Sequence, residues 1–311
     1  MVFVNYRLQT INYKLSSCQL SSNIGQLSTS YLSSSNMLLF PNCKINLGLN
    51  ITGKRDDGFH NLQTVFLPVP MQDVLEVIAS HNTTQPVIYS HSGLQITGEE
   101  SDNLCIKAYH LLKNDFPQLP GVAMHLHKVI PMGAGLGGGS ADGAFTLLLL
   151  NKKFSLGIGQ EQLISYALQL GSDCPFFIIN TPCFAEGRGE KLEKVTMPLS
   201  GYTLVLVNPG IHIPTGWAFS QIKPAKPAKS VKAIVSQPVS TWKEELANDF
   251  EKPVIAAYPQ LQSIKHALYQ QGAIYASMSG SGSTFYGLFA SNPQIPANIF
   301  PAGYFVKTVV L

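Results

Sequence analysis

Charged residues are scarce in this sequence. Asp, Glu, Lys and Arg together make up 13% of its 311 residues, whereas apolar residues make up 45%. Such a composition can bury a sizeable core and differs from that of a disordered chain. The 21 basic and 18 acidic residues form no clustered basic stripe, so we expect no nucleic-acid partner.

Long apolar runs and paired cysteines are also missing. No stretch of about 18 uncharged apolar residues occurs, so we expect a soluble protein without a membrane span. The five cysteines are odd in number and form no C-x-x-C pair, which favours a reducing, cytoplasmic compartment. Cys174 and Cys183 have apolar neighbours in the sequence and are expected to be buried without a chemical role.

The first 36 residues contain no acidic residue and lack the apolar core of a secretory signal. An organelle transit peptide would also be poor in acids and rich in Ser, but Arg7 and Lys14 are few basic residues for one. The globular pattern begins abruptly at Met37. We therefore expect residues 1–36 to be a flexible or non-native extension, with translation starting at Met37.

From Met37 onward, segments with strand-like alternation mix with segments of helical periodicity. Helices are predicted from Asp102, over 144–150 and over 161–170, and strands over 44–52, 63–70, 74–79, 122–127, 176–179 and 202–207. The Lys- and Pro-rich segment 222–229 predicts a surface loop. Because strands and helices do not strictly alternate, we predict an α+β fold of two lobes with a ligand cleft between them.

A dense glycine cluster stands before the second predicted helix. Residues 133–139 hold five glycines in seven positions, and Ser140 is expected to be the N-cap of the helix. Backbone N–H groups without neighbouring Cβ atoms can approach phosphate oxygens, and a helix N-terminus adds partial positive charge. We predict phosphate binding here; a tight turn without a ligand is the alternative.

Three common nucleotide-binding loops do not fit this cluster. Gly133, Gly135 and Gly138 formally match G-x-G-x-x-G, as in dinucleotide folds and protein kinases. A dinucleotide fold needs an acid at the end of the next strand about 20 residues later, where this chain begins a helix. The H-R-D and D-F-G motifs are absent, and no Gly-Lys-Ser/Thr ends the cluster.

Three ordered motifs resemble those of the GHMP kinase superfamily. They are the segments 41–47 (P-x-x-K-I-N-L), 131–140 (P-M-G-A-G-L-G-G-G-S) and 279–283 (S-G-S-G-S). The resemblance spans residues 38–311 and implies a small-molecule kinase with ATP as phosphoryl donor and Mg²⁺ as cofactor. It also implies an ATP-binding domain over residues 37–182 and a substrate-binding domain over residues 183–311.

Three further blocks resemble one branch of that superfamily: 57–64 (D-G-F-H-N-L-Q-T), 171–177 (G-S-D-C-P-F-F) and 184–190 (F-A-E-G-R-G-E). The branch implies phosphorylation of a cytidine-diphosphate-linked methylerythritol at its 2-hydroxyl, in the non-mevalonate route to isoprenoid precursors. We expect a monomer or weak homodimer that acts on this small molecule.

The resemblance implies a catalytic pair, with Asp173 as the carboxylate and Lys44 as its partner. A carboxylate within hydrogen-bond reach can accept the hydroxyl proton, while an ammonium group offsets negative charge on the transferred group. Taken alone, Asp173 would be an ordinary turn residue and Lys44 a solvated strand residue.

The same resemblance implies that aromatic residues bind the cytosine. Phe59, His60 and Phe219 match the positions that grip the base, and a stacked base gains about 1–3 kcal/mol. Related chains commonly carry Tyr where this one has Phe59, so a hydroxyl contact is lost. Asn46, Thr215 and the loop 279–283 are expected on the substrate side.

For the nucleotide, the resemblance implies the glycine loop and two residues outside it. The loop residues are Pro131, Met132, Gly133, Ala134, Gly135, Leu136, Gly137, Gly138, Gly139, Ser140 and Ala141, and the other two are Lys128 and Asn103. Ser140 is expected to face the phosphates or Mg²⁺, which prefers oxygen ligands. Ala141 stands where related loops often carry a second Ser.

No dedicated metal site is expected. His125 and His127 would share one strand face, but no third ligand of suitable spacing follows them, so we expect a structural or surface role. Two alternative functions remain open: a GHMP kinase for homoserine, mevalonate or a sugar, which should lack the cytosine-gripping residues, and a nucleotide-binding protein without catalysis, against which Lys44 and Asp173 argue.

Overall fold

The computed structural model describes residues 37–80 and 85–311, which lie within one compact unit. The extension predicted over residues 1–36 lies outside the described residues. No helix in the described ranges is long and apolar enough to cross a membrane.

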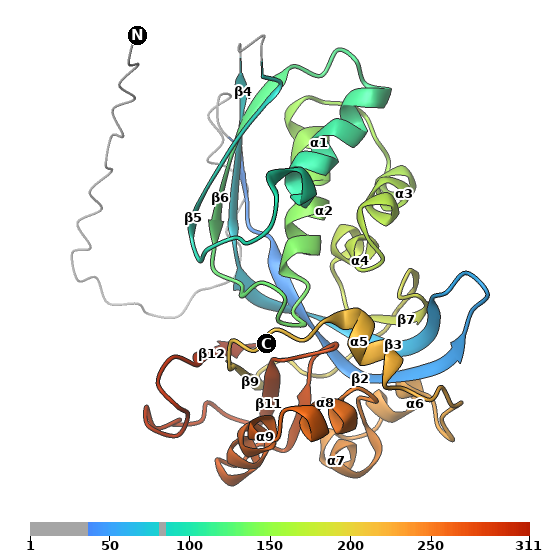
Figure 1. Ribbon diagram of the computed structural model, residues 1–311, viewed down its shortest axis with the longest axis vertical. Helices are drawn as coiled ribbons and strands as arrows, with labels where there is room; N and C mark the ends of the chain where they lie inside the picture. Colours follow the sequence, from blue (N-terminus) through green and yellow to red (C-terminus); the bar gives the residue numbers. More distant parts are fainter. Residues whose placement is uncertain (1–36, 81–84) are drawn as a thin grey trace. The chain divides into compact units, whose positions relative to one another are not determined.

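One sheet and four helices form the part of the fold drawn at the top of Figure 1. The sheet has the order β1 (Met37–Leu39), β4 (Val74–Ser80), β6 (Gly121–Lys128), β5 (Val87–Gly93), and its pairs are antiparallel except β5 with β6. The helices cover one face of it: α1 (Leu104–Asp115), α2 (Gly138–Lys153), α3 (Gln160–Leu170) and α4 (Cys174–Ile179). Alternate apolar side chains of β6 pack with α1 and α2 in one buried cluster.

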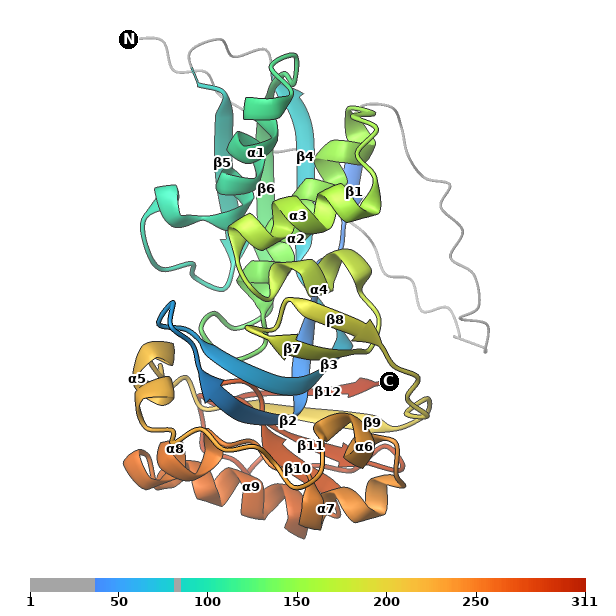
Figure 2. The same cartoon turned by 90° about the vertical axis from the view of Figure 1, so that its right-hand side faces the viewer.

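A second sheet crosses the middle of the molecule, as Figure 2 shows. Its order is β2 (Asn42–Lys54), β3 (His60–Gln72), β7 (Cys183–Gly187), β8 (Lys191–Lys194), all antiparallel. Eight consecutive residues of β2 are buried, because the strand is covered on both faces. This strand carries Lys44 and Asn46 into the interior of the protein.

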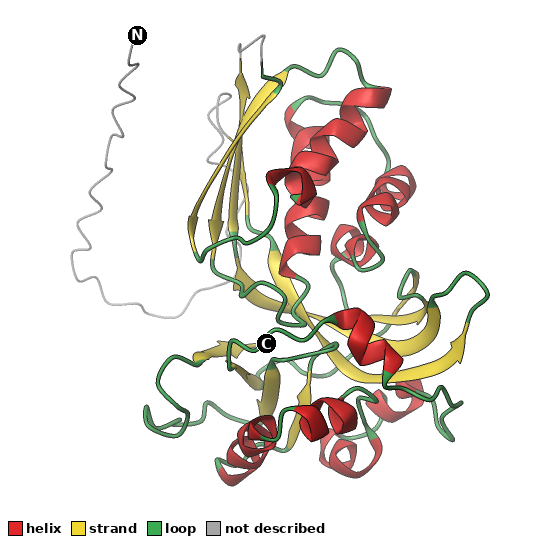
Figure 3. Cartoon of the chain, viewed as in Figure 1, coloured by secondary structure: helices red, strands yellow, loops and turns green. Residues whose placement is uncertain are grey.

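The third sheet has the order β10 (Tyr275–Met278), β11 (Phe285–Phe289), β9 (Thr203–Asn208), β12 (Phe305–Val310), all antiparallel. Around it lie α5 (Thr215–Ser220), α6 (Val231–Val235), α7 (Trp242–Glu245), α8 (Glu251–Ala257) and α9 (Gln260–Gln270). Two 3₁₀ turns, Glu100–Asp102 and Val239–Thr241, complete the regular elements of the described residues. Figure 3 shows α8 and α9 on the outer side of the third sheet.

The mixed α+β fold is confirmed, but two local predictions were wrong. Residues 176–179 belong to helix α4 rather than a strand; Pro175 fits the first turn of a helix, and a short apolar run does not reveal its period. The N-cap of helix α2 is Gly137 rather than Ser140, and the helix begins at Gly138. The φ of +70° at Gly137 lets the chain turn into the helix three residues earlier than predicted.

The predicted boundary between residues 182 and 183 stays a prediction. Strands β7 and β8 follow that point in the sequence and complete the sheet that β2 and β3 begin. The segment 222–229 contains no helix or strand, in agreement with the predicted loop.

Candidate active site

A pocket of about 960 Å³ collects most of the residues singled out in the sequence. This volume lies in the range of small-molecule sites. The expected site residues that line it are Lys44, Asn46, Phe59, His60, Pro131, Met132, Gly133, Ala134, Gly135, Gly137, Gly138, Gly139, Ser140, Asp173, Thr215, Phe219, Gly280 and Ser281. Leu136 and Ala141 of the glycine loop are buried beneath it, and Lys128 and Asn103 do not line it.

The glycine loop is held against the third motif. The hydroxyl of Ser279 donates to the carbonyl oxygen of Gly135 at 2.8 Å, and the N–H of Thr284 donates to that of Ala134 at 3.3 Å. At Gly135 the φ is +77°, and an added Cβ would lie 2.1 Å from the carbonyl oxygen of Ser279. Only glycine therefore allows the two loops to approach this closely.

Replacing Gly135 by Ala is expected to lower kcat/KM about tenfold or more, because both the positive φ and the contact with Ser279 force the loop to move. The matched control is Gly157→Ala, whose φ of +71° is similar but whose added Cβ would meet no atom within 4 Å. Equal activity losses in the two variants would contradict a special role for the loop contact. Steady-state kinetics on both variants measures the difference.

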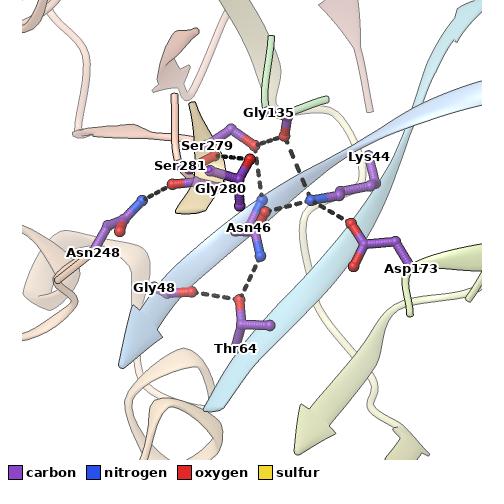
Figure 4. Close-up of polar contacts among 11 residues, drawn as sticks. Lys44, Asn46, Gly48, Thr64, Gly135, Asp173, Asn248, Ser279, Gly280 and Ser281 are labelled. Carbon is purple, nitrogen blue, oxygen red and sulfur yellow. Dashed lines mark hydrogen bonds and ion pairs between the residues drawn. The ribbon is translucent and has the colours of Figure 1, made fainter. Parts of the chain in front are cut away.

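Lys44 and Asp173 form an ion pair on the floor of the pocket, drawn in Figure 4. The ammonium nitrogen of Lys44 lies 3.4 Å from Oδ2 of Asp173, and the two side chains are 4% and 35% exposed. Lys44 also donates to Oδ1 of Asn46 at 2.6 Å and to the carbonyl oxygen of Gly135 at 3.5 Å. The ammonium group is thus fixed from three directions, while the carboxylate remains accessible from the pocket.

The position of Asp173 leaves its carboxylate free for chemistry. Asp173 stands at the N-cap of α4, yet its side chain makes no capping hydrogen bond. N-cap carboxylates commonly bond to the first helical N–H groups. Its accessible oxygen atoms can therefore accept a proton or a hydrogen bond from a ligand.

Asn46 is already engaged by the protein. Its Nδ2 donates to the hydroxyl of Thr64 at 3.0 Å, and Thr64 donates to the carbonyl oxygen of Gly48 at 2.5 Å. Figure 4 shows this chain of contacts leading from Lys44 across β2 and β3. Asn46 orients Lys44, and its expected contact with a substrate stays a prediction.

Two supporting residues, Thr64 and Asn248, were not among the predicted site residues, although Thr64 ends the block 57–64. Nδ2 of Asn248 donates to the carbonyl oxygens of Met278 and Gly280, both at 2.8 Å, and so fixes the third motif. Their partners are distant in the sequence: Thr64 is 18 residues from Asn46, and Asn248 is 30 residues from Met278. No local pattern predicts such pairs.

Aromatic side chains form the other end of the pocket. The rings of His60 and Phe219 stack with centroids 5.0 Å apart, and Phe250 supports Phe219 from the side at 4.9 Å. Phe59 is 51% exposed. The hydroxyl groups of Thr215 and Ser281 lie 3.3 Å apart at the same end. The structure thus brings together all three residues expected to bind the cytosine.

Lys128 lies behind the glycine loop. Its ammonium is fully buried and lies 2.5 Å from Asp73 and 2.7 Å from Asp142, and Asp73 accepts from the N–H groups of Val129 and Ile130. Burial, opposed by Lys128, raises the pKa of Asp142 to about 7. The group supports the start of the loop from inside, and the expected contact of Lys128 with a nucleotide stays a prediction.

Asn103 lines a second pocket, of about 450 Å³, next to Gly139. Its side chain caps α1 by accepting from the N–H of Cys105 at 2.9 Å. Tyr89, Leu104 and Met132 provide apolar surface in this pocket. Its size and its position beside the glycine loop suit a nucleoside.

The remaining candidates have structural surroundings. His125 contacts the hydroxyls of Ser90 and Ser92 at 2.8 and 2.9 Å, and His127 contacts Ser92 at 3.0 Å. No group of three or more metal-binding side chains occurs among the described residues. Cys174 and Cys183 are buried, and burial raises the pKa of Cys174 to about 12, which makes a thiolate unfavourable.

Comparison with known proteins agrees with the resemblance seen in the motifs. Residues 103–181 match the family model of the GHMP kinases N terminal domain, and residues 230–299 match that of the GHMP kinases C terminal domain. The chain is 53% identical over 272 residues to a 4-diphosphocytidyl-2-C-methyl-D-erythritol kinase of Bacteroides fragilis, covering 88% of this chain and 99% of that one. A kinase of the same name from Cytophaga hutchinsonii is 46% identical over 259 residues, covering 83% and 94%.

Solved structures give the same result. A 4-(cytidine 5'-diphospho)-2C-methyl-D-erythritol kinase superposes with a TM-score of 0.69 at 32% identity, covering 82% of this chain and 91% of that one. The mevalonate kinase of Methanococcus jannaschii shares the fold, with a TM-score of 0.62 at 11% identity over 89% of this chain and 99% of that one. This chain belongs to the GHMP kinases, in the family of the 4-diphosphocytidyl-2-C-methyl-D-erythritol kinases.

Proposed function

We propose that this chain transfers the γ-phosphoryl group of ATP to the 2-hydroxyl of 4-diphosphocytidyl-2-C-methyl-D-erythritol, giving the 2-phosphate and ADP. The reaction belongs to the non-mevalonate route to isoprenoid precursors. The observation that carries the proposal is one pocket with the Lys44–Asp173 pair on its floor, the glycine loop on one side and the aromatic residues at its end. The family membership established above supports the same reaction.

The chemical step needs little more than positioning and charge. The acceptor hydroxyl oxygen attacks the γ-phosphorus, the bond from that phosphorus to the oxygen bridging to the β-phosphate breaks, and ADP leaves with that electron pair. The hydroxyl proton passes to the carboxylate of Asp173. The ammonium of Lys44 lies 3.4 Å from that carboxylate. It stabilises the negative charge that develops on the transferred phosphoryl group.

The phosphates of ATP bind at the N-terminus of α2. This helix of 16 residues begins inside the glycine loop, so its first N–H groups and its dipole face the pocket. The nucleoside half of ATP then extends toward the second pocket, lined by Asn103 and Gly139. Lys128 supports this arrangement from behind the loop.

The residues present fit Mg²⁺ bound mainly through the phosphates. The oxygen donors beside the glycine loop are the Ser140 hydroxyl and the Asp173 carboxylate, and Mg²⁺ commonly takes one or two protein oxygens with phosphates and waters. Ser140 is the residue that would hold it. When bound, the ion neutralises charge on the phosphates; Asp173 keeps its role at the hydroxyl proton.

We also propose that the ATP-binding domain covers residues 37–182 and the substrate-binding domain residues 183–311. Lys44, the glycine loop and Asp173 precede this boundary, whereas Thr215 and Phe219 follow it. We expect the enzyme to work in the cytoplasm as a monomer or weak homodimer, without nucleic acid.

The cytosine is the acceptor group that the aromatic end of the pocket would recognise. His60 and Phe219 already stack in parallel, with an interplanar angle of 23°, and Phe59 lies beside them. A pyrimidine can insert against such rings, and the nitrogen atoms of His60 can bond to its polar edge. Kinases for homoserine, mevalonate or sugars have no cytosine to hold.

Phe219→Ala is expected to raise the KM for the cytidine acceptor about tenfold, since one stacking face is lost, and to leave the KM for ATP nearly unchanged. Steady-state kinetics with each substrate varied in turn measures both constants. Tyr258→Ala is the matched control, because Tyr258 is an aromatic residue that does not line the pocket. An equal loss of affinity for ATP in the Phe219 variant would contradict the cytosine role.

Competition by CDP tests the proposed function without any variant. CDP is expected to compete with the acceptor and not with ATP, because it carries the cytidine that the aromatic end binds. Competition with ATP alone would mean that the pocket has no separate cytidine site. The alternative kinases would then regain support.

A further inference from the structure

Arg188 lies in the wall of the acceptor site, in the turn between β7 and β8. It lines the pocket together with Phe59 and His60. Its guanidinium carbon is 4.8 Å from the ring centroid of Phe59, a cation–π contact. Neither the catalytic pair nor the glycine loop uses this residue.

The guanidinium is available to a ligand. Within residues 37–80 and 85–311, the side chain of Arg188 forms no ion pair or hydrogen bond, while its backbone N–H donates to Glu190 at 2.5 Å. The nearby acid Asp57 is engaged by Arg55, whose Nε and NH2 nitrogens donate to it at 2.9–3.1 Å. A stacked guanidinium covers the ring with its face and keeps its N–H edges free.

The charge of the pocket favours an anionic ligand at this end. Among the described residues that line the pocket, one is acidic: Asp173, whose negative charge is offset by Lys44. Arg188 and Lys54 add two further positive charges to the lining. The side chains that line the pocket therefore carry more positive than negative charge, while Asp57, just outside the lining, is paired with Arg55.

The acceptor carries a diphosphate between its cytosine and its reacting hydroxyl. The amides of the glycine loop serve the phosphates of the donor, so the acceptor's diphosphate needs other donors. A guanidinium binds phosphate oxygens through two parallel N–H bonds, and such charge-assisted bonds are strong. Arg188 stands beside Phe59, where the cytidine end of the acceptor binds.

We propose that Arg188 is a specificity-determining residue that binds the diphosphate of the acceptor while its stacked face holds Phe59 against the cytosine. This inference rests on the proposed function. Phe59 has no hydroxyl group, unlike the Tyr common at this position in related chains. The guanidinium of Arg188 supplies hydrogen-bond donors beside the Phe59 ring instead.

The test compares Arg188→Gln and Arg188→Lys with the unchanged full-length chain. Calorimetric titrations measure the Kd of CDP and of cytidine, which differ in the diphosphate alone. Arg188→Gln is expected to weaken CDP binding about ten- to hundredfold, the loss of a hydrogen bond to a charged group, and to change cytidine binding by about threefold or less. Arg188→Lys keeps the positive charge but not the two parallel N–H donors, so its Kd for CDP is expected to lie between those of Arg188→Gln and the unchanged chain.

Lys191→Gln is the matched control. It removes one positive charge from the same β7–β8 hairpin, at an exposed residue that does not line the pocket. This variant is expected to bind CDP like the unchanged chain. The acceptor's KM should rise in Arg188→Gln while the KM of ATP stays constant.

Two results would overturn the inference alone. In the first, Arg188→Gln binds CDP as tightly as the unchanged chain; in the second, it loses CDP and cytidine to the same extent, which would limit Arg188 to supporting the ring. A failure of the unchanged chain to bind CDP at all would overturn the proposed function, and this inference with it. An unchanged thermal unfolding midpoint in the variants excludes a folding defect.

Discussion

Replacing Asp173 by Asn is expected to lower kcat by about 10²–10⁴-fold and to leave the affinity for ATP nearly unchanged. The substitution keeps the size of the side chain but removes the carboxylate to which we assign the hydroxyl proton. Lys44 keeps its contacts with Asn46 at 2.6 Å and Gly135 at 3.5 Å, so the floor of the pocket should persist. Single-turnover and steady-state kinetics, with ATP binding measured by calorimetry, separate the two effects.

Glu244→Gln is the control for the loss of one negative charge. Glu244 is an exposed residue of α7 and does not line the pocket. It should turn over like the unchanged chain. Turnover by Asp173→Asn at the rate of this control would remove Asp173 from the catalytic step.

Replacing Lys128 by Met is expected to lower the free energy of unfolding by about 3–5 kcal/mol near neutral pH. The substitution leaves the carboxylates of Asp73 and Asp142 buried without their common cation, 2.5 and 2.7 Å from the lost ammonium. Urea unfolding of both chains measures the difference. Glycine-loop function should fall as well, because Asp73 holds the N–H groups of Val129 and Ile130.

The destabilisation should depend on pH in a defined direction. In the unchanged chain, burial raises the pKa of Asp142 to about 7 even with Lys128 beside it. Without the cation that pKa rises further. A buried carboxyl with a raised pKa stays protonated in the folded protein at low pH, and the folded protein becomes less stable as pH increases and this proton is lost. The free energy of unfolding lost in Lys128→Met should therefore be smaller near pH 5 than near pH 8.

An exposed ion pair provides the control for this prediction. Lys232 pairs with Glu193 at 2.6 Å, with side chains 42% and 60% exposed, and Lys232→Met should cost about 1 kcal/mol or less. Equal losses of unfolding free energy in Lys128→Met and Lys232→Met, without dependence on pH, would contradict the view that the buried Lys128, Asp73 and Asp142 group supports the loop.

Sequence alone predicted the α+β fold and most of the residues that share the pocket, but not the contacts that hold them there. The glycine cluster predicted a phosphate site because dense glycine before an apolar helix has few other uses. The resemblance placed Lys44, Gly135 and Ser279 in three separate motifs, and the structure brings the three together, although Gly135 and Ser279 are 144 positions apart. The contacts of Figure 4 agree with that grouping.

The features that sequence did not predict arise from packing. A lysine near a glycine loop suggests a phosphate ligand, but Lys128 is turned inward because Asp73 and Asp142 enclose it. The apolar run 176–179 is too short to reveal its period, and packing against the neighbouring helices makes it helical. Arg188 lies in a predicted block, yet its contact with Phe59 joins segments that are 129 residues apart in the chain.

The most direct test of the account is steady-state release of ADP with ATP and Mg²⁺ on four separate acceptors: 4-diphosphocytidyl-2-C-methyl-D-erythritol, homoserine, mevalonate and galactose. We expect turnover with the cytidine compound alone, because the aromatic end of the pocket and Arg188 have no partner in the other three. Turnover with another acceptor, or with none of the four, would contradict the proposed function.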